Sequence, residues 1–398
     1  MEIVKHLRKH STILAVDLAT SLGFIYSWNR GHKYVASAVS LCCIGGTYLY
    51  SRIKTRVKIR PNDAVIVTGC DSGLGYSLAL HCRQLGATVI AGVLRSDSPG
   101  AKKLMENDAF VYSLDVTKPI SVTDFAESVR TILERENLEL RCLINNAALM
   151  IFGEFEWQTE EQIRSQVEVN FLGTMRITRE LMPMIRAHSS RIVVISSHCN
   201  IQPIPGVAAY SGTKAAIGAW ATAMRLELKK YGVKVVCFIP GSFFRESNIL
   251  ARQTEYFETM RKSMTEEART FYGDYFTSYS QYFGSVAHGG NLEKLPDPRI
   301  YEIFEGALLD KYPSALYKHE SWRYFLYHAL FRITPSCVRD LLVQKFVQAP
   351  PWTKKTNASR SEVTQNPPMK EELPAENESP SMNKNNTIGN QNSVTKLC

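Results

Sequence analysis

The sequence predicts an α/β fold in which helices cover both faces of a doubly wound parallel sheet. Short apolar runs rich in β-branched residues alternate with amphipathic helical stretches from residue 64 onward. Strands that are apolar on both faces are typical of parallel sheets covered on both sides by helices. A glycine-rich turn follows the first such run, and a later helix carries a tyrosine and a lysine four positions apart. The 398 residues suffice for one domain of about 250 residues plus extensions.

Residues 1–60 are predicted to form a membrane anchor of one or two helices. Apolar stretches cover 12–28, interrupted by Asp17, and 34–50. Each is at the short end of what spans a bilayer. Basic residues before the first stretch and after the second favour a hairpin with both ends in the cytosol. A signal peptide or a mitochondrial presequence is the alternative, and Glu2 and Asp17 count against the presequence.

The charge and the cysteines exclude other classes of function. The net charge of +9 is concentrated in residues 1–60, which hold ten Lys and Arg against two acidic residues. The rest of the chain is nearly neutral, which argues against a nucleic-acid partner. The nine cysteines show no Cys-x-x-Cys and no zinc-ligand spacing, so we expect no metal and a reducing compartment for the globular part.

The elements after the anchor are expected in this order. A strand at 64–68 leads through the glycine turn into a helix at 74–85, with Gly86 at its C-terminal cap. Further strands are expected at 87–93, 110–114, 143–145, 192–196, 233–239 and 314–318, and helices at 160–186 and 208–231. The predicted domains are the anchor at 1–60, a globular domain at 61–347 with an aromatic-rich helical substrate region at 242–347, and a disordered tail at 348–398.

The glycine turn, Thr68-Gly69-Cys70-Asp71-Ser72-Gly73-Leu74-Gly75, has the features of a pyrophosphate cradle. Gly69 permits a tight turn, Gly73 lets the backbone approach the phosphates, and Gly75 allows close packing of the helix. The first amides of that helix then face the negative charge. A glycine-rich turn is often merely structural, but its place between a strand and a helix is typical of a Rossmann-type dinucleotide site.

Tyr210 and Lys214 lie one helical turn apart and therefore share a helix face. A free tyrosine has a pKa near 10, and a neighbouring positive charge favours the tyrosinate needed for acid/base chemistry at neutral pH. Ser197 precedes the tyrosine by thirteen positions. Each residue alone could be an ordinary surface residue, whereas the set in this order indicates proton transfer beside a nicotinamide cofactor.

Together these motifs resemble the classical short-chain dehydrogenase/reductase family over residues 62–245. The residues that carry the resemblance, in the family's order, are the glycine turn, Asp115-Val116, Asn145-Asn146-Ala147-Ala148, Asn170, Ser197, Tyr210 with Lys214, and Pro240-Gly241. The Thr-Gly-Cys-Asp-Ser-Gly variant, followed by Ala91-Gly92-Val93-Leu94, is similar to the branch of type-2 17β-hydroxysteroid, retinol and 3-hydroxybutyrate dehydrogenases.

The resemblance implies a role for each residue. Tyr210 would be the general acid/base, Lys214 would assist it and hold the nicotinamide ribose, and Ser197 would orient the substrate oxygen. Asn170 would support a water that links Lys214 to solvent. Asp115 would contact the adenine and Asn145 would close the cofactor site, although either could simply cap a strand end. The expected cofactor-binding residues are Thr68, Gly69, Asp71, Ser72, Gly73, Leu74, Gly75, Leu94, Arg95, Asp115, Val116, Asn145, Ala147, Tyr210, Lys214, Pro240 and Gly241.

Two positions depart from the family pattern, and the cofactor stays open between NAD and NADP. Ala148 replaces a glycine, which is tolerated unless the backbone needs a positive φ. Arg245 stands where a threonine near the nicotinamide amide is usual. No acidic residue follows the second strand to bind the ribose hydroxyls, and Arg95 there could pair with a 2′-phosphate. The resemblance to NAD-using oxidases nevertheless favours NAD.

The sequence thus predicts an NAD(P)-dependent enzyme that interconverts an alcohol and a ketone or aldehyde on a small lipophilic substrate, of steroid or retinoid type. The aromatic residues of 242–347 suit a lid over a bulky apolar molecule, with core packing or membrane contact as alternatives. The resemblance implies a homodimer and, with the anchor, the endoplasmic reticulum membrane with the catalytic domain facing the cytosol. The alternatives are a mitochondrial 3-hydroxybutyrate dehydrogenase, for which Arg245 could bind the acid, and a catalytically silent scaffold.

Overall fold

The computed structural model describes residues 11–51, 56–241, 248–285, 295, 297–347 and 349–352. The chain divides into two compact units, Met1–Lys58 with Leu309–Pro313, and the remainder. Arg245 and nearly all of the predicted disordered tail lie outside the described residues.

The first unit contains the helices α2 (Ser11–Asn29) and α3 (Lys33–Ser51), which occupy the two apolar stretches and pack against each other. A tight turn joins them, in which the His32 amide donates to the Ser27 carbonyl at 3.0 Å and Gly31 adopts φ +83°. Within the part of the chain that the structure describes, no helix combines the length and the apolarity needed to cross a membrane. The predicted span is therefore not confirmed.

The second unit is built on a parallel sheet whose described strands number seven, in the order β3-β2-β1-β4-β5-β6-β7. The strands are β1 (Asp63–Thr68), β2 (Thr88–Val93), β3 (Phe110–Ser113), β4 (Glu139–Asn145), β5 (Arg191–Ile195), β6 (Lys234–Ile239) and β7 (Leu316–Lys318). The strand order reverses between β1 and β4. In open sheets of this kind, ligands bind beyond the carboxyl ends of the strands at such a switch point.

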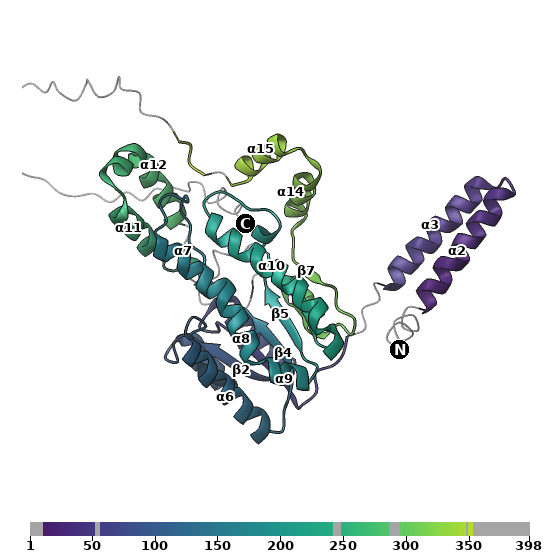
Figure 1. Ribbon diagram of the computed structural model, residues 1–398, viewed down its shortest axis with the longest axis horizontal. Helices are drawn as coiled ribbons and strands as arrows, with labels where there is room; N and C mark the ends of the chain where they lie inside the picture. The colour runs from purple at the N-terminus through teal and green to yellow at the C-terminus, as the bar shows by residue number, and fades with distance from the viewer. Residues whose placement is uncertain are drawn as a thin grey trace, which may run out of the picture. The chain divides into compact units, whose positions relative to one another are not determined.

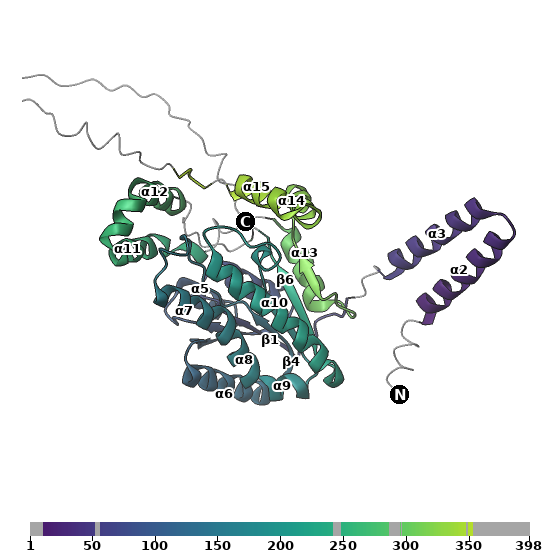
Figure 2. The ribbon, with the colours of Figure 1, turned by 45° about the horizontal axis from the view of Figure 1, so that its top comes forward.

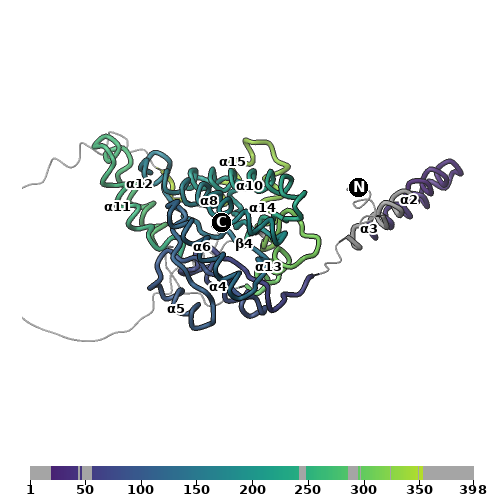
Figure 3. The backbone as a smooth tube through the Cα atoms, turned by 60° about the horizontal axis from the view of Figure 1, so that its bottom comes forward, coloured from purple at the N-terminus to yellow at the C-terminus, as the bar shows by residue number. Residues whose placement is uncertain are grey.

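Helices cover both faces of this sheet, as the apolar strands predict (Figure 1). The helical segments are α4 (Gly73–Gln84), α5 (Pro99–Glu106), α6 (Pro119–Arg135), α7 (Glu160–Val167), η1 (Glu168–Gly173), α8 (Thr174–Glu180), α9 (Met182–Ala187), η2 (His198–Asn200), α10 (Ala208–Leu228), η3 (Lys229–Tyr231), η4 (Asn248–Leu250), α11 (Gln253–Ser263), α12 (Glu266–Gly284), α13 (Arg299–Leu309), α14 (Trp322–Ile333) and α15 (Ser336–Val347). Figure 3 shows α4, α5 and α13 on one side and α8 and α10 on the other.

The main core lies between the sheet and the helices α6, α8 and α10. Phe125, Ile177 and Ile217 from these helices pack with Ile66 and Ile192 of the strands, and all five are at most 1% exposed. Burial of this much apolar surface is the main stabilising contribution to such a layer. It fixes the helix that carries Tyr210 and Lys214 against the sheet.

A second hydrophobic cluster contains most of the aromatic residues of α11 and α12, two helices that Figure 2 shows side by side. Trp157 lies edge-on to the rings of Phe276 and Tyr279, with ring centres 5.1 and 5.0 Å apart. The Tyr275 hydroxyl donates to Glu154 at 2.6 Å, which ties α12 to the loop before α7. Most aromatic rings of α12 are thus packed in this cluster, whereas Phe271 is exposed, and the substrate lid stays a prediction.

Candidate active site

A cavity of about 340 Å³ opens at the carboxyl ends of the strands, at the switch point between β1 and β4. Its wall is formed by the glycine turn, the ends of β2, β4, β5 and β6, and the first turns of α10. The sequence-predicted residues that line it are Gly69, Asp71, Ser72, Gly73, Leu74, Gly75, Leu94, Asp115, Val116, Ala147, Ser197, Tyr210, Lys214, Pro240 and Gly241. The fold therefore gathers at one edge of the sheet residues that lie up to 172 positions apart in the sequence.

The glycine turn has the shape of a phosphate cradle. Gly69 and Gly73 adopt φ +70° and +59°, a region that side chains other than glycine rarely occupy. A Cβ atom at Gly75 would lie 2.2 Å from the Gly69 carbonyl oxygen and 2.3 Å from Nδ2 of Asn146. Helix α4 begins at Gly73, so its first amides face the cavity. The residues present therefore fit the pyrophosphate of a dinucleotide.

Asn146 lines the cavity, although the sequence motifs predict no individual role for it. Its Nδ2 donates to the carbonyl oxygens of Thr68 and Gly69 at 2.9 and 3.1 Å, and its backbone amide donates to Thr68 Oγ1 at 3.0 Å. Asn145, expected to close the cofactor site, is buried and donates to Thr178 instead, at 2.9 Å. Because successive strand residues face opposite sides, the pair Asn145-Asn146 could have signalled that only one side chain reaches the cavity.

The end of β2 is fixed by Asp71 of the glycine turn. The two oxygens of its carboxylate accept hydrogen bonds from the backbone amides of Leu94 and Arg95, each at 2.8 Å. The Arg95 side chain is 70% exposed, lies 4.0 Å from Asp97 and does not line the cavity. An acidic side chain thus lies at the end of β2, although it comes from 23 positions earlier in the sequence.

Tyr210 and Lys214 are both buried on α10 and both line the cavity. The Lys214 ammonium donates to the Ile195 carbonyl at the end of β5, at 3.0 Å, and lies 5.6 Å from the centre of the Tyr210 ring. Burial lowers the pKa of Lys214 to about 8. The side chain therefore remains mostly charged at neutral pH, close enough to the phenol to favour its ionised form.

Asn170 lies outside the cavity wall, in the π-helical segment η1. Its amide exchanges two hydrogen bonds with the backbone of Leu149, at 2.7 and 2.8 Å, and donates to Thr213 Oγ1 at 3.0 Å. Thr213 in turn donates to the Tyr210 carbonyl at 2.7 Å. Single π turns often mark functional sites. The π turn interrupts the long helix expected over 160–186. Its Asn170 bonds Thr213, which lies between Tyr210 and Lys214 on α10.

Ser197 follows β5 and caps the short helix η2, with its Oγ accepting from the Cys199 amide at 3.2 Å. It faces the same cavity as Tyr210. The neighbouring wall also contains the polar Asn248 but is otherwise apolar, with Met150, Phe152, Cys199, Ile204, Val207 and Ile249. Among the described lining residues, Lys214 is the only basic one. Ala148 also lines the cavity and is absent from the residues with positive φ, so its methyl group causes no backbone strain.

Comparison with known proteins identifies the family. The model of the short chain dehydrogenase family matches residues 63–255. Estradiol 17-beta-dehydrogenase 2 of Mus musculus is 31% identical over 321 residues, covering 77% of this chain and 80% of the relative. The chain belongs to the short-chain dehydrogenase family. It is accordingly an oxidoreductase that acts on CH–OH groups, and this family uses NAD or NADP.

Other relatives of this short-chain dehydrogenase differ in their named substrates. D-beta-hydroxybutyrate dehydrogenase, mitochondrial, of Bos taurus is 32% identical and covers 70% of this chain and 83% of the relative. 11-beta-hydroxysteroid dehydrogenase type 2 of Ovis aries is 32% identical and covers 64% and 60%. A short-chain dehydrogenase structure from Streptomyces avermitilis matches with a TM-score of 0.51 at 23% identity, over 76% of this chain and 99% of that one, and supports the fold.

Proposed function

We propose that this short-chain dehydrogenase interconverts the hydroxyl and carbonyl forms of a lipophilic alcohol, of steroid or retinoid type, with NAD. The observation that carries the proposal is that Tyr210, Lys214 and Ser197 meet in a cavity whose remaining substrate side is largely apolar. Bound nicotinamide supplies the acceptor for the hydride of the carbinol carbon. The same groups serve both directions of the reaction.

The side chains divide the proton chemistry between them. Ser197 Oγ donates to the substrate oxygen and orients it toward the phenol. Tyr210 as tyrosinate takes the hydroxyl proton during oxidation and returns it during reduction. Lys214 stabilises the tyrosinate through its charge, 5.6 Å from the ring centre, while its remaining ammonium hydrogens hold the ribose. The glycine turn binds the pyrophosphate, and Asp115 and Val116 lie at the adenine side.

A lipophilic substrate is favoured over 3-hydroxybutyrate by the charge of the wall. A small carboxylate needs a cationic partner when it leaves water. Among the described residues that line the cavity, Lys214 alone is cationic, and it is assigned to the cofactor and the tyrosine. The thioether, aliphatic and aromatic side chains opposite it suit an apolar ring system.

Two assays with the purified full chain test the proposal. The first assay uses estradiol with NAD and represents the steroid class that the mouse relative's name states. The second uses D-3-hydroxybutyrate with NAD and represents the hydroxy acids. We expect the kcat/KM for estradiol, or for a retinoid tested beside it, to exceed that for the acid at least about a hundredfold. The opposite order would favour the hydroxy acid, and cofactor binding without turnover of any alcohol would favour the silent scaffold.

The preference for NAD follows from Asp71. Its carboxylate lies at the end of β2, where the adenosine ribose is bound in this fold, and a second negative charge from a 2′-phosphate would be repelled. We expect the parent protein to bind NAD more tightly than NADP. Arg95→Ala should change the Kd for NAD less than about twofold, because the side chain is largely exposed.

Asp71→Asn is the variant to compare with Arg95→Ala. It removes the negative charge and keeps one hydrogen-bond acceptor for the backbone amides of Leu94 and Arg95. It should shift the ratio of the two Kd values toward NADP by about tenfold, or about 1.4 kcal/mol. Calorimetric titration of each variant with both nucleotides measures this. A parent that prefers NADP and loses that preference in Arg95→Ala would contradict the assignment.

We also propose that residues 1–60 hold the protein on a membrane. Large apolar side chains on α2 and α3 are exposed, among them Leu22, Ile25, Tyr34 and Leu41 at 57–93%. Deletion of 1–60 is expected to move most of the protein from floating vesicles to the soluble fraction while NAD binding persists. Full retention on vesicles would instead assign membrane binding to the exposed Trp322 and Phe325 of α14. The homodimer implied by the family resemblance stays a prediction.

A further inference from the structure

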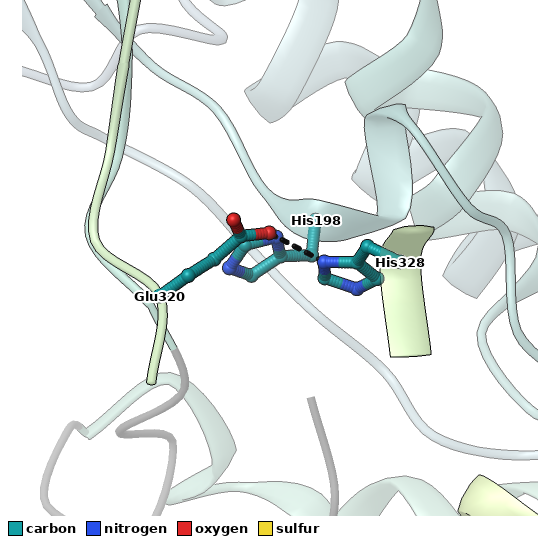
Figure 4. A group of neighbouring side chains, drawn as sticks. All are labelled: His198, Glu320 and His328. Atoms are coloured by element: carbon teal, nitrogen blue, oxygen red, sulfur yellow. Dashed lines mark hydrogen bonds and ion pairs between the residues drawn. The ribbon is translucent and has the colours of Figure 1, made fainter. Parts of the chain in front are cut away.

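His198 directly follows Ser197, but its side chain points to the opposite side of the cavity wall. Ser197 and Cys199 line the cavity, whereas His198 does not and is only 4% exposed. Its imidazole faces the segment after β7 and the helix α14, in the C-terminal part of the chain (Figure 4). The turn that presents Ser197 therefore has one face on the cavity and one on that C-terminal segment.

The segment binds the imidazole through a compact cluster. Glu320 Oε1 lies 2.5 Å from His328 Nδ1 and 3.6 Å from His198 Nδ1, and Glu320 Oε2 lies 2.5 Å from the ammonium of Lys318. The centres of the two imidazole rings are 4.6 Å apart, and the Tyr324 ring stacks on His198 at 6.3 Å. His198 also shares a hydrogen bond with the backbone of His319. Its contacts thus reach four positions between 319 and 328.

Two imidazoles and a carboxylate, with ligand atoms within 4.8 Å of one another, also match a zinc ligand set. The charges oppose a metal here. Lys318 already neutralises Glu320, so a divalent cation would leave a net charge of +2 on the described cluster, which holds no further carboxylate. Without a metal, the cluster holds one carboxylate and one ammonium and is balanced when both imidazoles are neutral.

We propose that His198 is a positioning residue for Ser197, through which the segment Lys318–His328 holds the serine hydroxyl toward the substrate. The inference rests on the proposed function only in taking Ser197 as the group that orients the substrate oxygen. Ser197 Oγ caps η2 through the Cys199 amide, so any rotation of this turn moves the hydroxyl. A hydroxyl displaced by about 1 Å can lower a rate by about a hundredfold.

The burial of the imidazole agrees with a neutral ring. Burial lowers the pKa of His198 to about 4, with Lys318 acting in the same direction and Glu320 opposing it. His198 therefore stays neutral at the pH of an ordinary assay. The groups that face it are Glu320, His328, Lys318 and Tyr324.

A double-mutant cycle on the full-length protein tests the coupling, with NAD and estradiol as the probes. His198→Leu should lower kcat/KM for the alcohol between about 10- and 100-fold and leave the Kd for NAD within twofold. His198→Gln, whose amide can still donate to the His319 backbone, should recover most of the activity. In a Ser197→Ala background, His198→Leu should change kcat/KM less than twofold, because the serine it positions is gone.

His81→Leu is the control for loss of a largely covered histidine that pairs with a glutamate. His81 lies 3.1 Å from Glu305, has its pKa lowered chiefly by burial, and does not line the cavity. It should lower the melting temperature but not kcat/KM. If the double variant instead shows a loss of kcat/KM equal to the product of the losses in His198→Leu and Ser197→Ala, the two residues act independently and the inference is overturned. Stoichiometric zinc in the purified protein would overturn it as well.

Amide hydrogen exchange separates this inference from the proposed function. His198→Leu should speed the exchange of the amides of residues 198–200, whereas His81→Leu should not. If no alcohol is turned over, or Ser197→Ala is fully active, the proposed function fails and the exchange experiment alone decides the positioning role. Unchanged exchange in His198→Leu would contradict it.

Discussion

Tyr210→Phe is expected to lower kcat at least about a thousandfold while the Kd for the cofactor stays within about twofold. The variant removes only the hydroxyl group, and the buried ring keeps its packing in the second hydrophobic cluster. Without the phenol, no described group on the cavity wall combines the position beside Ser197 with a proton that Lys214 can help to release. Single-turnover kinetics with NAD and the alcohol measure the loss.

Tyr275→Phe is the matched control for that experiment, because its hydroxyl bonds Glu154 and does not line the cavity. It should keep kcat within about twofold and lower stability by about 1 kcal/mol, the typical contribution of one hydrogen bond. A kcat for Tyr210→Phe within tenfold of the parent would remove Tyr210 from the chemistry.

Lys214→Met should abolish turnover and stabilise the protein without cofactor. Burial lowers the pKa of Lys214 from 10.5 to about 8, which corresponds to about 3 kcal/mol of unfavourable free energy at neutral pH. The lost hydrogen bond to Ile195 costs about 1 kcal/mol, so a net gain of roughly 2 kcal/mol is expected. Activity and cofactor affinity should fall together, because the ammonium serves both the tyrosine and the ribose.

The stability gained in Lys214→Met is expected to depend on pH. Unfolded lysine holds its proton up to about pH 10.5, whereas the folded side chain releases it near pH 8. The unfolded state therefore binds more protons between these values, and the stability of the parent rises with pH across that window. The advantage of Lys214→Met should be full below pH 8 and shrink toward pH 10.5. Melting curves of both proteins measure it, and a variant less stable than the parent at pH 7 would contradict the account.

The sheet and the reactive pair were predictable because their signals are local. Apolar strands, a glycine turn between strand and helix, and a tyrosine and lysine one turn apart each imply a geometry without reference to distant residues. The Asp71 contact to the end of β2 was not predictable in this way, since it joins a side chain to amides 23 and 24 positions later.

Other features depend on contacts between residues that are distant in the sequence. The helix expected over 160–186 has continuous helical periodicity, yet the amide of Asn170 bonds the Leu149 backbone and the segment adopts a π turn. The aromatic rings of α12 have the composition of either a lid or a core. The contacts of Phe276 and Tyr279 with Trp157, more than 100 residues earlier in the sequence, could not be read from the sequence of α12 alone.

Transfer of a labelled hydride decides whether this cavity carries out the proposed reaction. The parent protein, NAD and estradiol deuterated at its carbinol carbon are incubated, and the mass of the NADH is measured. We expect one deuterium per NADH, formed together with the ketone, and no such product with Tyr210→Phe. Ketone formed with the deuterium released into water, or NADH without deuterium, would contradict hydride transfer in this cavity.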